Sequence, residues 1–171
     1  NYVEKVDDNI QMIEVGNGSM GSNYLESEEY YYKALDYGWH LAPTNGQDNH
    51  ALNWGDADNL TAVIAEELTE EAFYEAMQAR RVYSTETRNL RLEVSANGQM
   101  MGSILDVEKG GNIHFEIKAS DPEDKIEKIE IITNGGKTIA ETTLETPAYE
   151  AEFTTDITVG AGKNWYVVKV T

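Results

Sequence analysis

Cysteine is absent from this chain of 171 residues. A chain without thiols has no disulfide framework and no thiolate metal site. Long apolar runs are absent as well, because no run approaches the ~20 residues that a helix needs to cross a bilayer. These absences leave the redox compartment undecided, and they remove any sequence signal for a membrane-spanning segment.

Basic residues are scarce, with 13 Lys and Arg against 31 Asp and Glu and a net charge of −18. Phosphate backbones and anionic lipid surfaces are bound by basic patches, so this balance argues against bulk nucleic-acid binding and against docking on anionic membranes. A single phosphoester at a metal centre remains compatible, because the metal ions would supply positive charge. The hydrophobic content of 40% is enough for one ordinary domain or two small ones.

The hydrophobic pattern changes its period near Arg88 to Leu90. Residues 1–88 combine short apolar runs with helical patterns, which predicts an α/β part. In residues 89–171 apolar side chains alternate with polar ones, and turn signals such as Asn97-Gly98 separate roughly seven short strands. The sequence therefore predicts two domains, and the second is an immunoglobulin-like β-sandwich.

Within residues 1–88 we expect strands near 10–15 and 61–65 and helices over about 24–37 and 69–80. Thr69 is the expected N-cap of the second helix, with Leu68 packing on Phe73. At least one tyrosine of the cluster 30–32 is expected to pack inward.

Two polar residues follow the apolar run that starts at Leu41, namely Asp48 and His50. In an extended backbone residues two apart point to the same side, so these side chains would converge. A carboxylate oxygen and an imidazole nitrogen make half of a divalent metal site. The alternative is an aspartate bonded to its own loop beside a surface histidine, and the spacing alone favours that alternative.

Several blocks in fixed order carry a family resemblance: residues 32–44, 46–50, 53–55, 61–69 and 80–85. Together they resemble the C-terminal part of a PHP (polymerase and histidinol phosphatase) domain. They are most similar to bacterial metallohydrolases, often secreted, whose PHP domain precedes a β-sandwich. The resemblance implies that residues 1–88 are the C-terminal portion of a distorted β/α barrel and that Asp48 and His50 are metal ligands.

The remaining PHP ligands are not in this sequence, which has 3 histidines, His40, His50 and His114, and no His-x-His. We therefore expect a C-terminal fragment of a metal-dependent phosphoesterase that is inactive without an upstream His-rich half. The implied cofactors are divalent Mn, Zn or Fe ions that require ligands outside this chain. The implied substrate is a small phosphoester, and the implied location is extracellular or the cell envelope. His114 alternates with apolar residues and is expected on the surface.

Five further residues are candidates for substrate or neighbouring contacts: Asn17, Gln47, Asn49, Trp54 and Tyr83. The resemblance places Asn17 at a strand end near the site, and its alternative is a turn residue of positive φ between two glycines. Trp54 would either pack beneath the site or form a wall of the substrate pocket.

A second function remains open, that of a non-catalytic accessory or binding module in a secreted or cell-surface protein. Its sandwich would cap the barrel or hold the enzyme to a polymer. Capping is favoured because residues 89–171 show no obvious row of exposed aromatic side chains. A second copy of the chain is one candidate to cover the apolar faces of an incomplete barrel, so self-association is part of the hypothesis.

Overall fold

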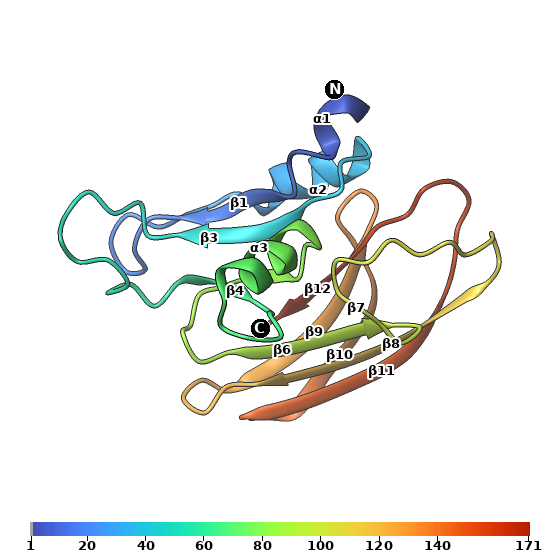
Figure 1. The fold of residues 1–171 in the computed structure, drawn as a ribbon. Coiled ribbons are helices and arrows are strands. Elements are labelled where there is room, and N and C mark those ends of the chain that lie inside the picture. The colour runs from blue at the N-terminus through green and yellow to red at the C-terminus, as the bar shows by residue number, and fades with distance from the viewer. Residues whose placement is uncertain (1) are drawn as a thin grey trace. The chain divides into compact units, whose positions relative to one another are not determined.

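The computed structural model describes residues 2–171, in which strands predominate over helices (Figure 1). The chain divides into two compact units, Asn1–Arg88 and Asn89–Thr171. Among the described residues, no helix has the length and apolar character needed to span a membrane. Each unit has its own strands and its own buried residues.

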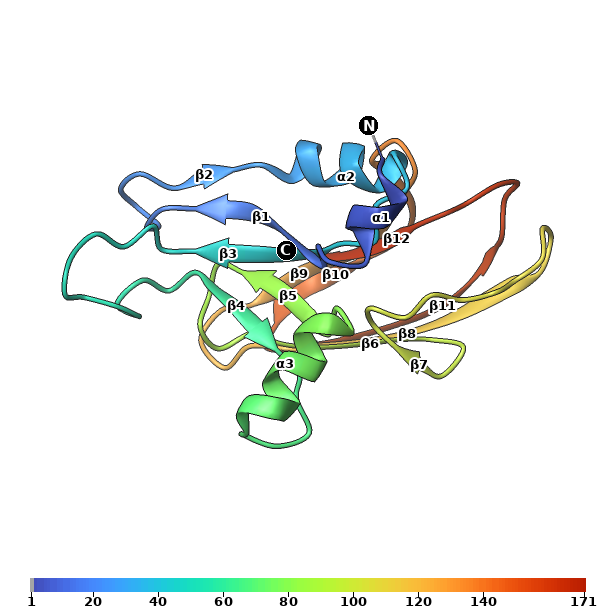
Figure 2. The same cartoon turned by 45° about the horizontal axis from the view of Figure 1, so that its top comes forward.

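The first unit contains eight elements: α1 (Glu4–Asp7), β1 (Met12–Asn17), β2 (Leu25–Glu26), α2 (Glu28–Asp36), β3 (Ala42–Gly46), β4 (Leu60–Val63), α3 (Glu70–Gln78) and β5 (Val82–Thr85). One sheet has the order β2-β1-β3, in which β1 is antiparallel to β2 and parallel to β3 (Figure 2). β4 and β5 form a separate antiparallel pair. The parallel strands β1 and β3 require a crossover connection, and α2 lies within it.

Helix α2 begins at Glu28, so the prediction of a helix from residue 24 is wrong. Leu25 and Glu26 pair with β1 instead, because a strand partner distant in sequence overrides the local helical pattern. The other end is as expected, since Gly38 follows the helix with φ 98°. Tyr31 is buried at 5% exposure, which confirms that one tyrosine of the cluster packs inward.

Helix α3 begins where the sequence predicts, because the Thr69 hydroxyl accepts a hydrogen bond from the Ala72 amide at 3.3 Å. The predicted packing of Leu68 on Phe73 is wrong, since Leu68 is fully exposed. Phe73 instead meets the ring of Tyr74 edge to face, with centroids 6.2 Å apart. Ala76 is the buried residue of this helix.

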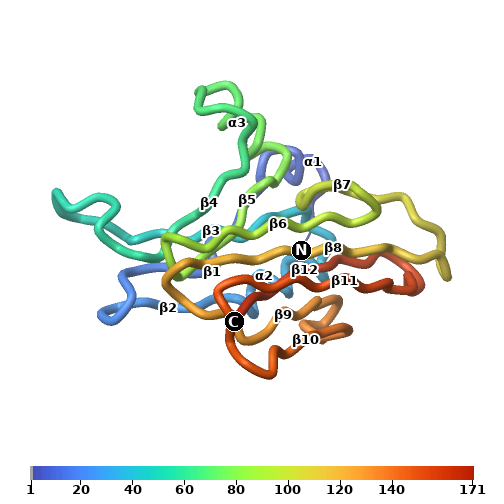
Figure 3. Tube along the Cα trace, turned by 90° about the horizontal axis from the view of Figure 1, so that it is seen from below, coloured from blue at the N-terminus to red at the C-terminus, as the bar shows by residue number. Residues whose placement is uncertain are grey.

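The second unit consists of seven antiparallel strands: β6 (Arg91–Ala96), β7 (Gln99–Met100), β8 (Asn112–Ser120), β9 (Ile126–Thr133), β10 (Lys137–Ala148), β11 (Glu150–Thr158) and β12 (Tyr166–Val170). They form two sheets, of order β11-β8-β6-β7 and β10-β9-β12, and Figure 3 traces β6, β8 and β11 side by side. Asn97 and Gly98 both have positive φ, 50° and 75°, in the tight turn between β6 and β7.

The interior of the second unit is apolar. Strand β8 alternates buried and exposed residues, and its inward side chains include Phe115 and Ile117. Phe115 contacts Tyr166 of the other sheet, with ring centroids 5.5 Å apart. Ile129 and Ile131 of β9 are completely buried. The prediction of a β-rich second half built from antiparallel sheets is confirmed, and the arrangement is that of a β-sandwich.

Candidate functional site

The predicted ligand pair lies in the segment that follows β3. Asp48 has φ 52°, so the extended backbone assumed for this segment is wrong. The side chains nevertheless approach each other, with His50 Nε2 3.3 Å from Asp48 Oδ1. Both are open to solvent, at 85% exposure for the His50 side chain and 47% for that of Asp48. A turn therefore brings together the two groups that the sequence predicted to converge on one face of a strand.

Gln47 and Asn49 shape the loop that carries this pair. Gln47 donates from Nε2 to the Asn53 carbonyl at 3.2 Å and accepts from the Gly55 amide at 3.1 Å. Asn49 donates to the Asn53 side chain and accepts from the Ala51 amide at 3.0 Å. In this structure both candidates hold the loop backbone, and their contact with a substrate stays a prediction.

Arg88 holds the second half of the same loop, a role that the sequence did not reveal. Its Nη2 donates to the carbonyls of Gly55 and Ala57 at 3.1 and 3.0 Å, and its Nε donates to Asp58 Oδ1 at 3.0 Å. An exposed ion pair alone contributes little. The carbonyl bonds matter more, because they fix the loop backbone at several points.

Trp54 and Tyr83 lie in opposite environments. Trp54 is 78% exposed, so it does not pack beneath the site, and its role as a wall of a pocket stays a prediction. Tyr83 belongs to β5 and is 7% exposed. A buried ring stabilises the first unit by packing.

Asn17 is the last residue of β1 and pairs in register with Gly46, the last residue of β3. The positive φ at this point belongs to Gly18, at 96°, so the alternative of Asn17 as a left-handed turn residue is wrong. Its Nδ2 donates to Glu14 Oε2 at 3.0 Å. The structure thus places Asn17 at the strand edge from which the Asp48 loop departs.

Two buried asparagines tie these strand ends together. Asn59 is 2% exposed, and its Nδ2 lies 2.9 Å from the Gly18 carbonyl, 2.8 Å from Asn45 Oδ1 and 3.3 Å from the Gly46 carbonyl. We call Asn45 and Asn59 the amide clasp. It could not be recognised from the sequence, because both asparagines flank apolar runs in the manner of turn residues.

Asn45 also connects β3 to the β4–β5 pair. Its backbone N–H donates to the Thr61 hydroxyl, which in turn donates to the Asn45 carbonyl, both at 2.8 Å. Its Nδ2 donates to the Tyr24 hydroxyl at 2.8 Å and to the Thr85 carbonyl at 3.2 Å. Side-chain hydrogen bonds therefore join β3 to β4 and β5. The Tyr24 hydroxyl fits here because residue 16 is glycine, since a Cβ at Gly16 would overlap that hydroxyl.

Two polar groups at the clasp are at least partly buried. Burial, together with the nearby Glu86 carboxylate, raises the pKa of Tyr24 to about 12 and outweighs the hydrogen bond from Asn45, which lowers it, so the hydroxyl stays neutral. Asn59 Oδ1 is buried without a hydrogen-bond partner within residues 2–171. Leaving a buried acceptor unpaired costs roughly 1–3 kcal/mol.

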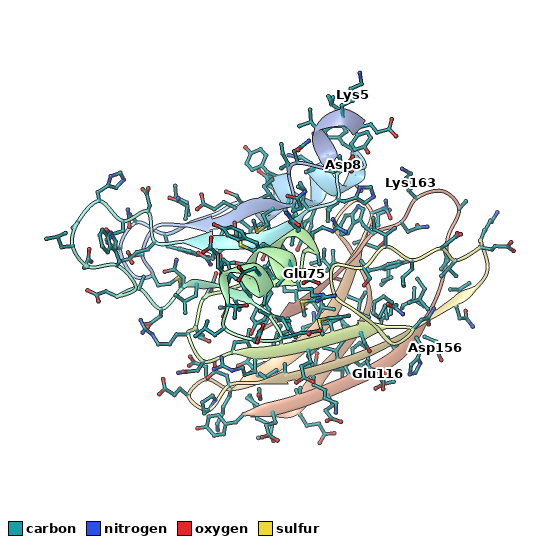
Figure 4. All side chains as sticks on the ribbon, viewed as in Figure 1. Lys5, Asp8, Glu75, Glu116, Asp156 and Lys163 are labelled. Atoms are coloured by element: carbon teal, nitrogen blue, oxygen red, sulfur yellow. The ribbon has the colours of Figure 1, made fainter. Side chains whose placement is uncertain are left out.

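Each of the 3 histidines lies beside an aspartate. His40 Nδ1 is 2.5 Å from Asp7 Oδ2, and His114 Nδ1 is 2.8 Å from Asp156 Oδ1. Asp156 projects from β11 into solvent, as does Glu116 from β8 (Figure 4). His114 is exposed on the sandwich, as predicted. In the Asp48 and His50 pair the carboxylate faces Nε2 of the imidazole and not Nδ1, and the separation of 3.3 Å is the longest of the three.

The donor set of Asp48 and His50 fits a divalent metal, since it joins a carboxylate oxygen and an imidazole nitrogen. Within residues 2–171 no group of three or more His, Cys, Asp and Glu side chains gathers as a metal site. A metal ion held by Asp48 and His50 would require further ligands.

Comparisons with protein-family models, with curated proteins and with solved structures found no match to this chain. The family resemblance therefore stays a prediction from the sequence blocks.

Proposed function

We propose that this chain is the C-terminal portion of a metal-dependent phosphoesterase of the PHP superfamily, with Asp48 and His50 as two of its metal ligands. The observation that carries the proposal is the 3.3 Å separation of His50 Nε2 and Asp48 Oδ1. Two donors at about 2.1 Å from one tetrahedral or octahedral ion lie roughly 3.0–3.4 Å apart. The pair therefore has a separation suited to sharing a metal.

All three pairs lie within hydrogen-bonding distance, and the other two are shorter than the Asp48–His50 pair. His114 Nδ1 and Asp156 Oδ1 are 2.8 Å apart, within the range of about 2.7–2.9 Å for charge-assisted bonds. His40 and Asp7 are closer still. The chain thus contains an internal control, because the same two residue types occur elsewhere in an arrangement that favours a proton between them.

Residues 1–88 contain one strand–helix–strand unit, β1–α2–β3, and their origin in a β/α barrel is part of the proposal. The two strands are parallel, and a helix lies in their connection. In β/α barrels the active site lies at the carboxyl ends of the strands, and here that edge carries Asn17 and the loop after Gly46. The separate antiparallel pair β4 and β5 does not fit a β/α barrel, so in residues 1–88 only the β1–α2–β3 unit resembles one.

The loop residues have defined tasks under this proposal. Gln47, Asn49 and Arg88 hold the loop in place, so Asp48 and His50 are positioned before any ligand arrives. Bound Mn, Zn or Fe ions would acidify a water and neutralise charge on a phosphoryl oxygen. Two exposed ligands do not retain such ions alone, so we expect this chain by itself to be inactive.

A Zn²⁺ titration of the chain at about pH 7, followed through the imidazole NMR resonances, tests the ligand assignment. We expect His50 to reach half-saturation at a Zn²⁺ concentration at least about fivefold lower than His114, because only His50 shares its donor position with a second ligand. Asp48→Asn should abolish the difference. Equal responses of His50 and His114 in the unmodified chain would contradict the proposal.

A second function concerns residues 89–171, for which we propose an immunoglobulin-like accessory domain of a secreted or cell-envelope protein. Seven antiparallel strands in sheets of four and three support it. We expect the domain to cap the enzyme and not to bind a polymer. A glycan array probed with the full chain checks this, and reproducible binding to one glycan class would favour the polymer-binding role.

A further inference from the structure

One side-chain amide joins the segments that follow both parallel strands. Asn59 Nδ2 contacts the carbonyl of Gly18, the residue after β1, and the carbonyl of Gly46, the last residue of β3. It also donates to Asn45 Oδ1. Because Asn59 is 2% exposed, water does not compete for these bonds.

The same amide closes the loop that carries the ligand pair. The loop leaves the sheet at Gly46 and returns at Asn59, so the bond from Asn59 Nδ2 to the Gly46 carbonyl holds its two ends together. Asp48 lies two residues from the first end. Arg88 fixes the returning half through the Gly55 and Ala57 carbonyls. A loop fixed at its base and along one side presents its side chains in one arrangement.

Asn59 makes these bonds through its amide nitrogen and not through its oxygen. Asn59 Oδ1 has no partner among the described residues. An apolar side chain of similar volume would remove that unpaired atom, but it would also take the Asn59 donor away from the Gly18 carbonyl, Asn45 Oδ1 and the Gly46 carbonyl, which costs stability. What an apolar residue cannot do is hold the Gly18 and Gly46 carbonyls at a fixed distance.

We propose that Asn59 is a positioning residue of the candidate metal site: its amide sets the spacing of the strand ends and thereby the approach of Asp48 to His50. This inference rests on the proposed function of that pair. It assigns to Asn59 no contact with the metal or the substrate.

The test repeats the Zn²⁺ titration on Asn59→Leu and on Thr61→Val. The threonine variant is the matched control, because Thr61 bonds the backbone of Asn45 in the same region without touching Gly18 or Gly46. We expect Asn59→Leu to raise the half-saturating Zn²⁺ concentration at His50 at least about fivefold. Thr61→Val should change it less than about twofold, and His114 should respond alike in all three proteins.

Equal losses at His50 in both variants would mean that Asn59 acts only through general stability, and would overturn the inference. An unchanged His50 response in Asn59→Leu would overturn it as well, while the metal assignment stands. If His50 and His114 respond to the same Zn²⁺ concentration in the unmodified chain, the proposed function is contradicted. The inference about Asn59, which rests on that function, is then contradicted too. If Asn59→Leu does not fold, Asn59→Ser, which is too short to bond both strand ends, is judged by the same outcomes.

Discussion

The two units differ in the contacts that join their sheets. In the first unit the strands are joined across their sheets by buried polar side chains, chiefly Asn45 and Asn59. In the second unit the sheets meet through apolar side chains such as Ile129 and Ile131, which have no exposure. Apolar burial contributes stability without direction, whereas hydrogen bonds fix direction at a smaller net gain. The buried polar contacts of the first unit lie at the base of the loop that carries the candidate site.

The largest effect is expected from a cavity in the apolar interior. Ile131→Ala should lower the free energy of unfolding of the second unit by about 2–5 kcal/mol, because it removes buried methylene groups and leaves a void. Urea unfolding followed by NMR signals of that unit measures it. Ile139→Ala is the control, since Ile139 is 40% exposed. Equal losses in the two variants would remove the claim that β9 forms the core.

A smaller effect is expected from the polar interior of the first unit. Asn45→Ala should lower its free energy of unfolding by about 1–3 kcal/mol, because the Asn59 amide loses an acceptor and the Tyr24 hydroxyl loses a donor. Amide hydrogen exchange of β3 and β4 reports the change. Asn23→Ala removes one exposed contact with the Ser19 amide and should cost less. A loss above about 3 kcal/mol in Asn45→Ala would contradict the contrast between the units.

The smallest expected effect is on the stability of the first unit at low pH, and it depends on Asp7. Burial alone would raise the pKa of Asp7, but hydrogen bonds from the His40 backbone and ring and from the Tyr2 hydroxyl outweigh it and lower the pKa below 3.8. A folded pKa below the unfolded one gives stability that is complete above the unfolded value and lost as pH falls through the folded value. Acid unfolding curves should show Asp7→Asn to be less stable than the unmodified chain above about pH 4, by about 1 kcal/mol or less, with the two converging at lower pH. A difference that grows on acidification would contradict this account.

The same contrast explains what the sequence could predict. Ile113, Phe115 and Ile117 alternate with polar residues, and this period identifies strand β8. Thr69 marks the start of α3 because capping is a local interaction. The pairing of Leu25 with β1 is distant in sequence, so the helical pattern around it misled the prediction.

The candidate site was predictable only in part. Asp48 and His50 do lie close together, but the extended backbone from which we predicted this is wrong, because Asp48 has a left-handed backbone. The amide clasp was missed because a buried asparagine and a turn asparagine look alike in sequence. What distinguishes them is burial among carbonyl groups of other strands, which only the fold provides.

The central claim is that Asp48 and His50 bind metal in a hydrolytic site, and the most direct measurement is hydrolysis of p-nitrophenyl phosphate by the complete protein that the gene encodes, with Mn²⁺ in excess. The account predicts that His50→Ala lowers metal-dependent turnover by more than about 100-fold, while His114→Ala, which breaks the chemically similar pair on the sandwich, changes it less than about twofold. Full activity in His50→Ala would contradict the account.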